Sequence, residues 1–217
     1  MLERKISQHR TCAIVRHGGT GPSTRSRTSD NRNGPWGENW NYKAPEAFRY
    51  CFGNVNGLHA LAYHEKHAQI TTSIEKHKMD FLGLAEINLN LKKVRPTNQW
   101  KDRFKKLNTN SHCATNEHTT SEEKRIFGGT AYLTSKTMSH KVEAKGEDPT
   151  KLGRWTWALL TGRQGIKTRI ISGYRPIKDT SNRVGTVHSQ HQKYFHDTKT
   201  DKEPRQGFLD DLQVLIK

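Results

Sequence analysis

The sequence predicts an α/β protein, a sandwich with mixed sheets built from about five strands and about three helices. One observation is the order strand, helix, strand across residues 48–86, which is typical of a right-handed crossover between parallel strands. The other is a pair of strand-like segments, 153–163 and 165–176, joined by a short glycine turn, which indicates an antiparallel hairpin. A chain that contains both kinds of pairing is expected to form mixed sheets.

The predicted parallel unit begins with residues 48–55, FRYCFGNV, which alternate aromatic with small or polar side chains as a strand does. Residues 61–78 follow with side chains on one helical face: Tyr63, His67, Ile70, Ile74 and His77. Residues 79–86, MDFLGLAE, form a short apolar run that suits a buried strand.

The rest of the chain adds fewer clear signals. Residues 88–108 space Trp100, Phe104 and Leu107 for a basic amphipathic helix, and 125–135 resemble a strand that contains a glycine pair. Residues 205–217 have helical spacing. The polar segments 108–124 and 178–203 are expected to be loops.

Composition divides the chain into two parts. Only 31% of the residues are hydrophobic, and residues 1–47 are rich in Ser, Thr, Arg, Asn and Gly, so we expect a disordered basic arm before one domain at 48–217. The net charge of +16 favours a polyanionic partner, with DNA or another nucleic acid first and an anionic membrane surface second.

The cellular compartment is predicted from two missing signals and from the cysteine content of the sequence. No apolar run is long enough for a membrane span, and the N-terminus lacks the apolar core of a secretory signal. Three cysteines, widely spaced and odd in number, favour a reducing compartment, which predicts an intracellular protein, nuclear or cytoplasmic.

Polar side chains follow both strands of the predicted parallel pair. Asn54 and Asn56 end the first strand and Glu86 ends the second. Because parallel strands end at the same edge of a sheet, these groups should lie together, where α/β sheets usually hold ligands. A carboxylate and amides suit Mg²⁺, which takes one or two protein carboxylates and fills its other positions with water and phosphate. The alternative is that Asn56-Gly57 is only a turn and Glu86 only a charged strand end.

Seven basic residues after Glu86 are candidate contacts to a nucleic-acid backbone, which would give affinity without sequence reading. They are Lys92, Lys93, Arg95, Lys101, Arg103, Lys105 and Lys106. The alternative is a solvated helix face that binds nothing.

Five stretches occur in an order that resembles the endonuclease/exonuclease/phosphatase superfamily, and most closely the endonuclease domains of non-LTR retrotransposons. They are GNVNGL, DFLGLAEINL, GGTAYLTS, GRWTWALL and RIISGYRP, within residues 48–176. The resemblance implies a DNase I-like four-layer sandwich. It makes Asn54 the active-site asparagine, Asn56 its partner beside the metal site, Glu86 the ligand of Mg²⁺ (or Mn²⁺), and Tyr174 the tyrosine that reaches the scissile phosphate.

The sequence also departs from the family. Ala85, Ile87 and Ile177 replace family residues, and the G-D-x-N and S-D-H motifs are absent. The domain is therefore expected to be incomplete at its C-terminus, and the activity of the chain to be strongly reduced or lost although it descends from an enzyme.

The function that the resemblance implies is that of a Mg²⁺-dependent DNA endonuclease domain, derived from or fused to a reverse transcriptase polyprotein. The alternatives are a phosphatase or phosphodiesterase of the same superfamily, acting on a lipid or small phosphate, and a non-catalytic nucleic-acid-binding fragment. The charge of +16 favours nucleic acid over a small substrate.

Overall fold

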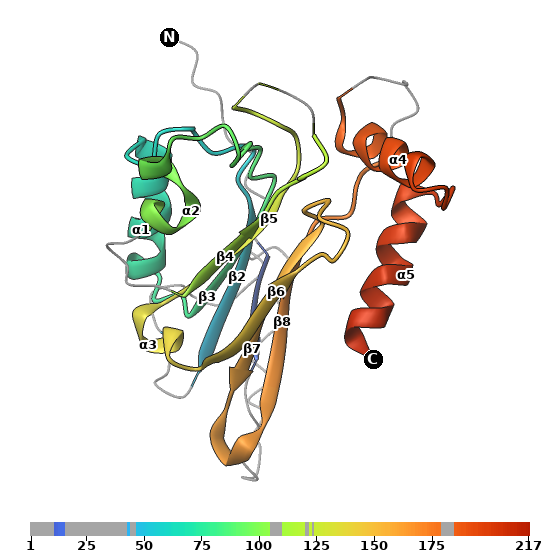
Figure 1. Cartoon of the computed structure of the whole chain (residues 1–217). Coiled ribbons are helices and arrows are strands. Elements are labelled where there is room, and N and C mark those ends of the chain that lie inside the picture. Colours follow the sequence, from blue (N-terminus) through green and yellow to red (C-terminus); the bar gives the residue numbers. More distant parts are fainter. Residues whose placement is uncertain are drawn as a thin grey trace, which may run out of the picture.

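Two β-sheets pack face to face with helices on their outer sides in the computed structural model of the chain (Figure 1). The structure describes residues 11–15, 43, 47–104, 110–119, 122, 124–178 and 185–217. This arrangement confirms an α/β protein with a mixed sheet.

The larger sheet has five strands in the order β1-β2-β3-β5-β4. They are β1 (Thr11–Val15), β2 (Phe48–Asn54), β3 (Phe81–Ala85), β4 (Ser111–Ala114) and β5 (Thr130–Thr134). Strands β2 and β3 are parallel and are joined through helix α1 (Glu65–Lys76), whereas the other neighbours are antiparallel. The predicted crossover is therefore confirmed.

The smaller sheet is antiparallel and contains β6 (Val142–Glu147), β7 (Trp155–Thr161) and β8 (Lys167–Gly173) in that order. A 3-10 turn, η3 (Arg163–Gly165), closes the predicted β7–β8 hairpin, and the Gly162 N–H donates to the Ile166 carbonyl at 2.7 Å. Strand β6 was not predicted; its residues alternate in burial, but its low content of large apolar side chains hides that alternation in the sequence.

The remaining helical segments are η1 (Pro96–Asn98), α2 (Trp100–Arg103), α3 (Lys136–Ser139), α4 (Val187–Asp197) and α5 (Pro204–Ile216). Helices α1 and α2 cover the outer side of the larger sheet, and α4 and α5 lie beyond the smaller one (Figure 1). No helix within the described residues combines the length and the apolar character that crossing a bilayer requires.

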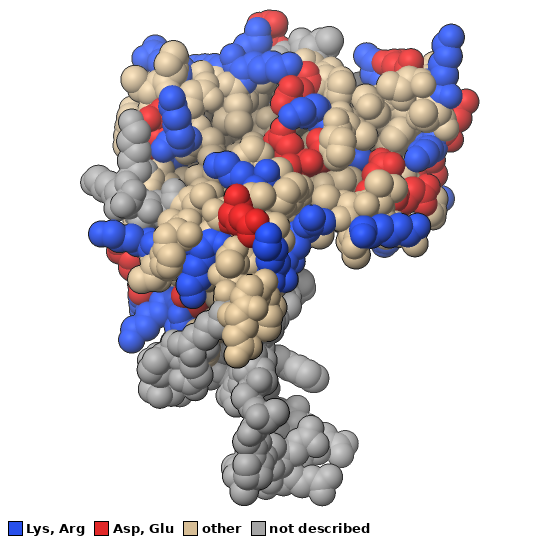
Figure 2. All heavy atoms as spheres, turned by 60° about the horizontal axis from the view of Figure 1, so that its bottom comes forward, with Lys and Arg blue, Asp and Glu red and all other residues tan. Residues whose placement is uncertain are grey.

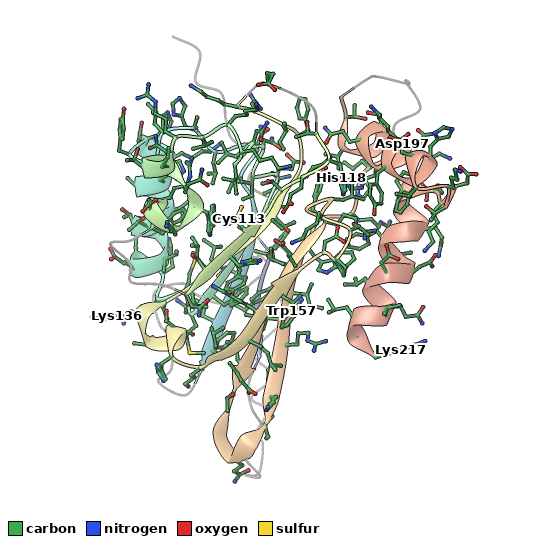
Figure 3. The ribbon with its side chains drawn as sticks, in the orientation of Figure 1. Cys113, His118, Lys136, Trp157, Asp197 and Lys217 are labelled. Carbon is green, nitrogen blue, oxygen red and sulfur yellow. The ribbon has the colours of Figure 1, made fainter. Side chains whose placement is uncertain are left out.

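Helix α4 joins the fold through a small aromatic contact. The ring of His118, which precedes β5, lies 4.6 Å from the Tyr194 ring of α4 (Figure 3). Beside it, the Asn116 side-chain amide donates to Gln190 at 2.8 Å. The loop before β5 is therefore held against α4.

Apolar side chains fill the space between the larger sheet and helices α1 and α2. The buried members are Cys51, Leu58, Ile74, Met79, Leu82, Leu84, Ile87, Leu89, Trp100, Phe104, Ala131 and Leu133. Trp100 and Phe104 were predicted on the apolar face of a helix, and both belong to this core. Tyr63, predicted on the buried face of the first helix, instead lies before α1 and is 81% exposed.

The facing sheets meet where Phe81 of β3 and Tyr132 of β5, stacked with ring centroids 5.1 Å apart and fully buried, cluster with Ala158 and Leu160 of β7. Gly83 of β3 lies against Ser172 of β8, where a Cβ on the glycine would come 2.9 Å from the serine hydroxyl. That hydroxyl donates to the Leu84 carbonyl at 3.3 Å. The absence of a side chain at residue 83 therefore lets the two sheets approach closely.

A buried arginine links the smaller sheet to the C-terminal helix. The Arg154 guanidinium donates to both Asp148 oxygens, at 2.7 and 2.8 Å, and to Asp211 of α5 at 2.8 Å. It also lies 4.5 Å over the Trp155 ring, which Phe208 of α5 contacts edge-on. Burial alone would raise the pKa of Asp148, but the hydrogen bonds and charge of Arg154 outweigh it and lower that pKa.

Several polar segments have more structure than their sequence predicts. Strand β1 lies within the predicted disordered arm; apart from residues 11–15, 43 and 47, that arm lies outside the described residues. The predicted loops 108–124 and 178–203 contain β4 and α4. Helix α4 buries only His191 and Phe195, so its sequence shows no apolar stripe.

The basic helix predicted over residues 88–108 is also wrong as a single element. The structure has η1, beginning at Pro96, and the short helix α2 in its place. Residues 105–109 lie outside the described residues.

Adding a methyl group to a glycine of the larger sheet should lower the free energy of unfolding only where neighbouring atoms leave no room for it. We expect Gly83→Ala to lower the free energy of unfolding by about 1–3 kcal/mol, because the new methyl group overlaps the buried Ser172. Gly53→Ala is the matched control, since a Cβ there meets nothing within 4 Å. Urea unfolding of both variants measures the difference; equal stability would contradict the close packing.

Loss of the Asp148 charge should destabilise the fold by about 3–5 kcal/mol, because Asp148→Asn leaves Arg154 buried without its main partner. Since the folded pKa of Asp148 is depressed, its stabilisation is present above about pH 4 and is lost as the pH falls through the folded pKa. Urea unfolding between pH 7 and pH 2 should therefore show a larger acid-dependent loss in the wild type than in Asp148→Asn, which keeps the other carboxylates whose pKa values are lowered. The exposed Asp197→Asn serves as control and should keep the wild-type profile.

Candidate functional site

The pairing of β2 with β3 continues beyond the ends of both strands. The Val55 N–H donates to the Ala85 carbonyl at 3.0 Å, the Gly57 N–H to Glu86 at 2.7 Å, and the Leu58 N–H to Ile87 at 2.8 Å. The backbone after Asn54 therefore runs beside the backbone of Glu86, as the parallel pairing predicted.

The N-V-N-G stretch forms a compact turn that exposes its two amides. The Asn54 side-chain oxygen accepts a hydrogen bond from the Asn56 N–H at 2.8 Å, and Asn56 and Gly57 have positive φ angles of 46° and 84°. Lys66 of α1 donates to the Val55 and Gly57 carbonyls, at 2.6 Å each. Both asparagine side chains are exposed. The stretch is thus a turn, as the alternative interpretation held, and it also presents polar groups at the sheet edge.

Glu86 and Tyr174 come together from different sheets. Glu86 is half-buried and has a positive φ of 54°. Tyr174 follows β8, where its N–H donates to the Arg154 carbonyl at 2.8 Å. Burial, the negative charge of Glu86 and a side-chain hydrogen bond with Glu86 together raise the pKa of Tyr174, so its hydroxyl stays protonated at neutral pH.

Asn88 has a structural role at this edge, and it was not among the predicted site residues. It is 2% exposed and has a positive φ of 53°. Its N–H donates to the Gly128 carbonyl at 2.8 Å, and its side-chain oxygen accepts the Gly128 N–H at 2.7 Å. Asn88 therefore fixes the predicted glycine pair, Gly128-Gly129, against the segment after Glu86. The repeated N-x-N pattern, Asn54-Val55-Asn56 and Asn88-Leu89-Asn90, was the available signal.

Two basic side chains flank the turn. The Arg125 guanidinium lies 3.5 Å from the position that a Cβ on Gly57 would occupy. Burial first, and then the charge of Arg125, lower the pKa of Lys66, which shows that the two cations are close enough to repel. The surroundings of the sheet edge therefore favour an anion.

The predicted nucleic-acid contacts divide into three groups. Lys92, Lys93, Arg95 and Lys101 are exposed; Lys92 donates to the Glu117 carbonyl at 2.6 Å and Lys93 pairs with the Glu122 carboxylate. Lys105 and Lys106 lie outside the described residues. The third group is Arg103 alone, and the structure corrects that prediction.

Arg103 is buried and stabilises a loop. Its guanidinium donates to the His59 and Ala60 carbonyls, at 2.7 and 2.8 Å, and lies 2.8 Å from the His67 Nε2. Burial and the charge of Arg103 lower the pKa of His67 to about 4, so the imidazole is neutral and accepts from the guanidinium. A side chain used in this way is not available to a phosphate.

A magnesium site at this edge is compatible with the residues present. Among the residues that the structure describes, no three or more His, Cys, Asp or Glu side chains gather in a metal-binding group. Mg²⁺ needs fewer protein ligands, because water and phosphate fill most of its positions. The half-buried Glu86 follows one strand and the exposed Asn56 follows its neighbour, which meets that smaller requirement, and the ligand assignment for Glu86 and Asn56 stays a prediction.

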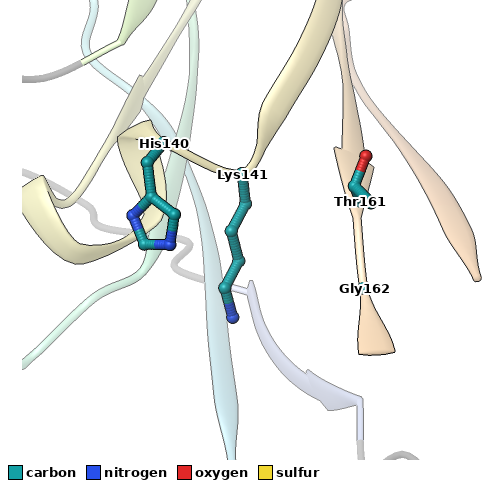
Figure 4. Close-up of a pocket in the computed structure, with 4 residues that line it drawn as sticks. All are labelled: His140, Lys141, Thr161 and Gly162. Carbon is teal, nitrogen blue, oxygen red and sulfur yellow. The ribbon is translucent and has the colours of Figure 1, made fainter. Parts of the chain in front are cut away.

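Two surface cavities lie away from this edge. One, of about 440 Å³, is lined by His140, Lys141, Thr161 and Gly162 at the opposite end of the smaller sheet (Figure 4). The other lies beside Asp80, at the start of β3. On the face that Figure 2 shows, basic and acidic side chains are interspersed, as on an ordinary solvated surface. Because neither cavity holds convergent site residues, the edge that carries Asn54 and Glu86 is the better candidate.

Comparison of the chain with protein-family models and with curated proteins finds no match in either.

The contact between Asn88 and Gly128 should be detectable in solution. We expect Asn88→Ala to destabilise the fold by about 1–3 kcal/mol, because the buried Gly128 N–H loses its acceptor. The same variant should speed amide hydrogen exchange at Gly128, measured by NMR. Asn88→Asp, which keeps an acceptor oxygen, is the control; equal protection of Gly128 in Asn88→Ala and wild type would exclude the proposed anchor.

Proposed function

We propose that the protein is a Mg²⁺-dependent phosphodiester hydrolase, an endonuclease-like domain of retroelement origin that acts on DNA. The observation that carries the proposal is the side-chain contact of Glu86 with Tyr174, which come from two separate motifs, beside the main chain that follows Asn54. Two facing sheets with helices on both outer sides also agree with a DNase I-like four-layer sandwich (Figure 1).

Each of the three residues has a role that its environment supports. Glu86 would hold Mg²⁺, or Mn²⁺, and the bound ion would supply Lewis-acid polarisation of the phosphate. The Asn54 side-chain oxygen is already occupied by the Asn56 N–H, so its exposed NH₂ group is the part that can donate to a phosphate oxygen. Tyr174 is protonated, and its single hydroxyl proton bonds Glu86 in the free protein, so donation to the phosphate would require the hydroxyl to turn away from the carboxylate.

The expected rate of phosphodiester hydrolysis is low. The sequence has no G-D-x-N and no S-D-H motif, and the resemblance assigns the attacking water and much of the phosphate binding to these motifs. General-base and charge-stabilising groups each contribute roughly 10²–10⁴ in rate. The same absence favours a second candidate, a non-catalytic nucleic-acid-binding protein that uses the exposed Lys92, Lys93, Arg95 and Lys101.

Nicking of supercoiled plasmid by the purified chain tests the proposal. We expect slow nicking that requires Mg²⁺ or Mn²⁺ and falls to background in Glu86→Gln, because the uncharged amide binds the ion much more weakly than the only carboxylate proposed for the site. Glu143→Gln is the control, since that exposed carboxylate pairs with Lys167 in the smaller sheet, away from the site.

The outcomes separate the two candidates. Salt-sensitive DNA binding without any nicking would favour the non-catalytic candidate. Nicking that is equal in Glu86→Gln and wild type would show a different site or a contaminant, and a chain that neither binds nor nicks DNA would reject both candidates.

A further inference from the structure

The segment that precedes β5 places an exposed aromatic ring beside the candidate site. Phe127 is 52% exposed, which is unusual for so large an apolar side chain. The Arg125 guanidinium carbon lies over this ring, 5.9 Å from its centroid. An arginine on an exposed phenylalanine is a pair that nucleic-acid-binding proteins use to hold a base and its phosphate.

Contacts of the neighbouring residues fix the position of this pair. Gly128, next to Phe127, exchanges two hydrogen bonds with Asn88, two residues after Glu86. The Arg125 guanidinium lies beside Gly57, whose N–H donates to the Glu86 carbonyl. Phe127 and Arg125 therefore stand at the rim of the same sheet edge that carries Asn54 and Glu86.

Two cations, Arg125 and Lys66, stand at this rim. Among the described residues, neither Arg125 nor Lys66 forms an ion pair with a carboxylate. Their proximity is unfavourable for the free protein, and an anion between them would relieve the repulsion. A phosphate close to the Asn54 turn meets this requirement.

We propose that Phe127 stacks on an unpaired nucleotide base while Arg125 and Lys66 bind the adjoining phosphate, so that the preferred substrate is a single-stranded or locally unpaired nucleic acid. The proposal deepens the proposed function and depends on it for the reaction, but not for binding. In a duplex the faces of the bases are covered by their neighbours, so only an unstacked base can lie on the Phe127 ring.

Fluorescence anisotropy with the full chain tests this inference. The probes are a labelled single-stranded DNA oligonucleotide and its blunt duplex, in EDTA so that no cleavage occurs. We expect tighter binding of the single strand, about tenfold weaker single-strand binding for Phe127→Ala, and little change for the duplex. Phe127→Trp should keep the preference, whereas Phe127→Leu, which keeps an apolar side chain without a ring, should lose it.

Matched controls separate stacking from general surface effects. Ile166→Ala removes a side chain that is 54% exposed at the far end of the β7–β8 hairpin, and it should bind both probes like wild type. Arg125→Gln should weaken both probes, because a phosphate contact does not depend on base pairing.

Two results would overturn the inference: wild-type binding with no preference for the single strand, or equal single-strand affinity for Phe127→Ala and Ile166→Ala. A preference that depends on Phe127, in a chain that does not nick plasmid, would support this inference while the proposed function fails. Nicking that is insensitive to Phe127, together with no single-strand preference, would support the function and reject the inference.

Discussion

The candidate site depends on hydrogen bonding between two parallel segments after their strands have ended. Three further main-chain bonds, from Val55, Gly57 and Leu58, continue the β2–β3 pairing. Asn54 is the ladder partner of Ala85, the residue before Glu86, and these further bonds keep the two segments together beyond the strand ends. A right-handed crossover thus brings together residues that are about thirty positions apart in the sequence, and Asn88 extends the same ordering to the glycine pair before β5.

Arg154 connects the smaller sheet to this edge through its main chain and to helix α5 through its side chain. Its carbonyl accepts the Tyr174 N–H, while its guanidinium holds Asp148 and Asp211. One residue therefore positions the tyrosine and anchors α5. Burying an arginine is costly unless its charge is paired, and the two carboxylates and the Trp155 ring match the charge, although the buried Nη1 has no hydrogen-bond partner among the described residues.

The sequence predicted those elements whose apolar pattern is strong. Strands β2, β3, β7 and β8 and helix α5 lie where they were expected, because aromatic and branched side chains mark their buried faces. Strand β4 and helix α4 were missed, since their order comes from pairing with β5 and from contacts such as His118 with Tyr194. The proximity of the segments that carry Asn54 and Glu86 could be predicted from the parallel pairing alone. The burial of Arg103 and the position of Arg125 could not be predicted from the sequence, because both depend on tertiary contacts between distant loops.

Three residues with side chains, Asn56, Glu86 and Asn88, have left-handed backbone conformations within one small region. Asparagine tolerates this conformation, but for glutamate it is unfavourable by about 1–2 kcal/mol. The rest of the fold must therefore hold Glu86 in a strained backbone conformation. A glycine at residue 86 would relieve the strain but would remove the carboxylate. Stability would favour glycine at residue 86, whereas the proposed metal binding requires the carboxylate. Since the strain is already present in the free protein, a ligand that binds there need not supply that part of the ordering free energy itself.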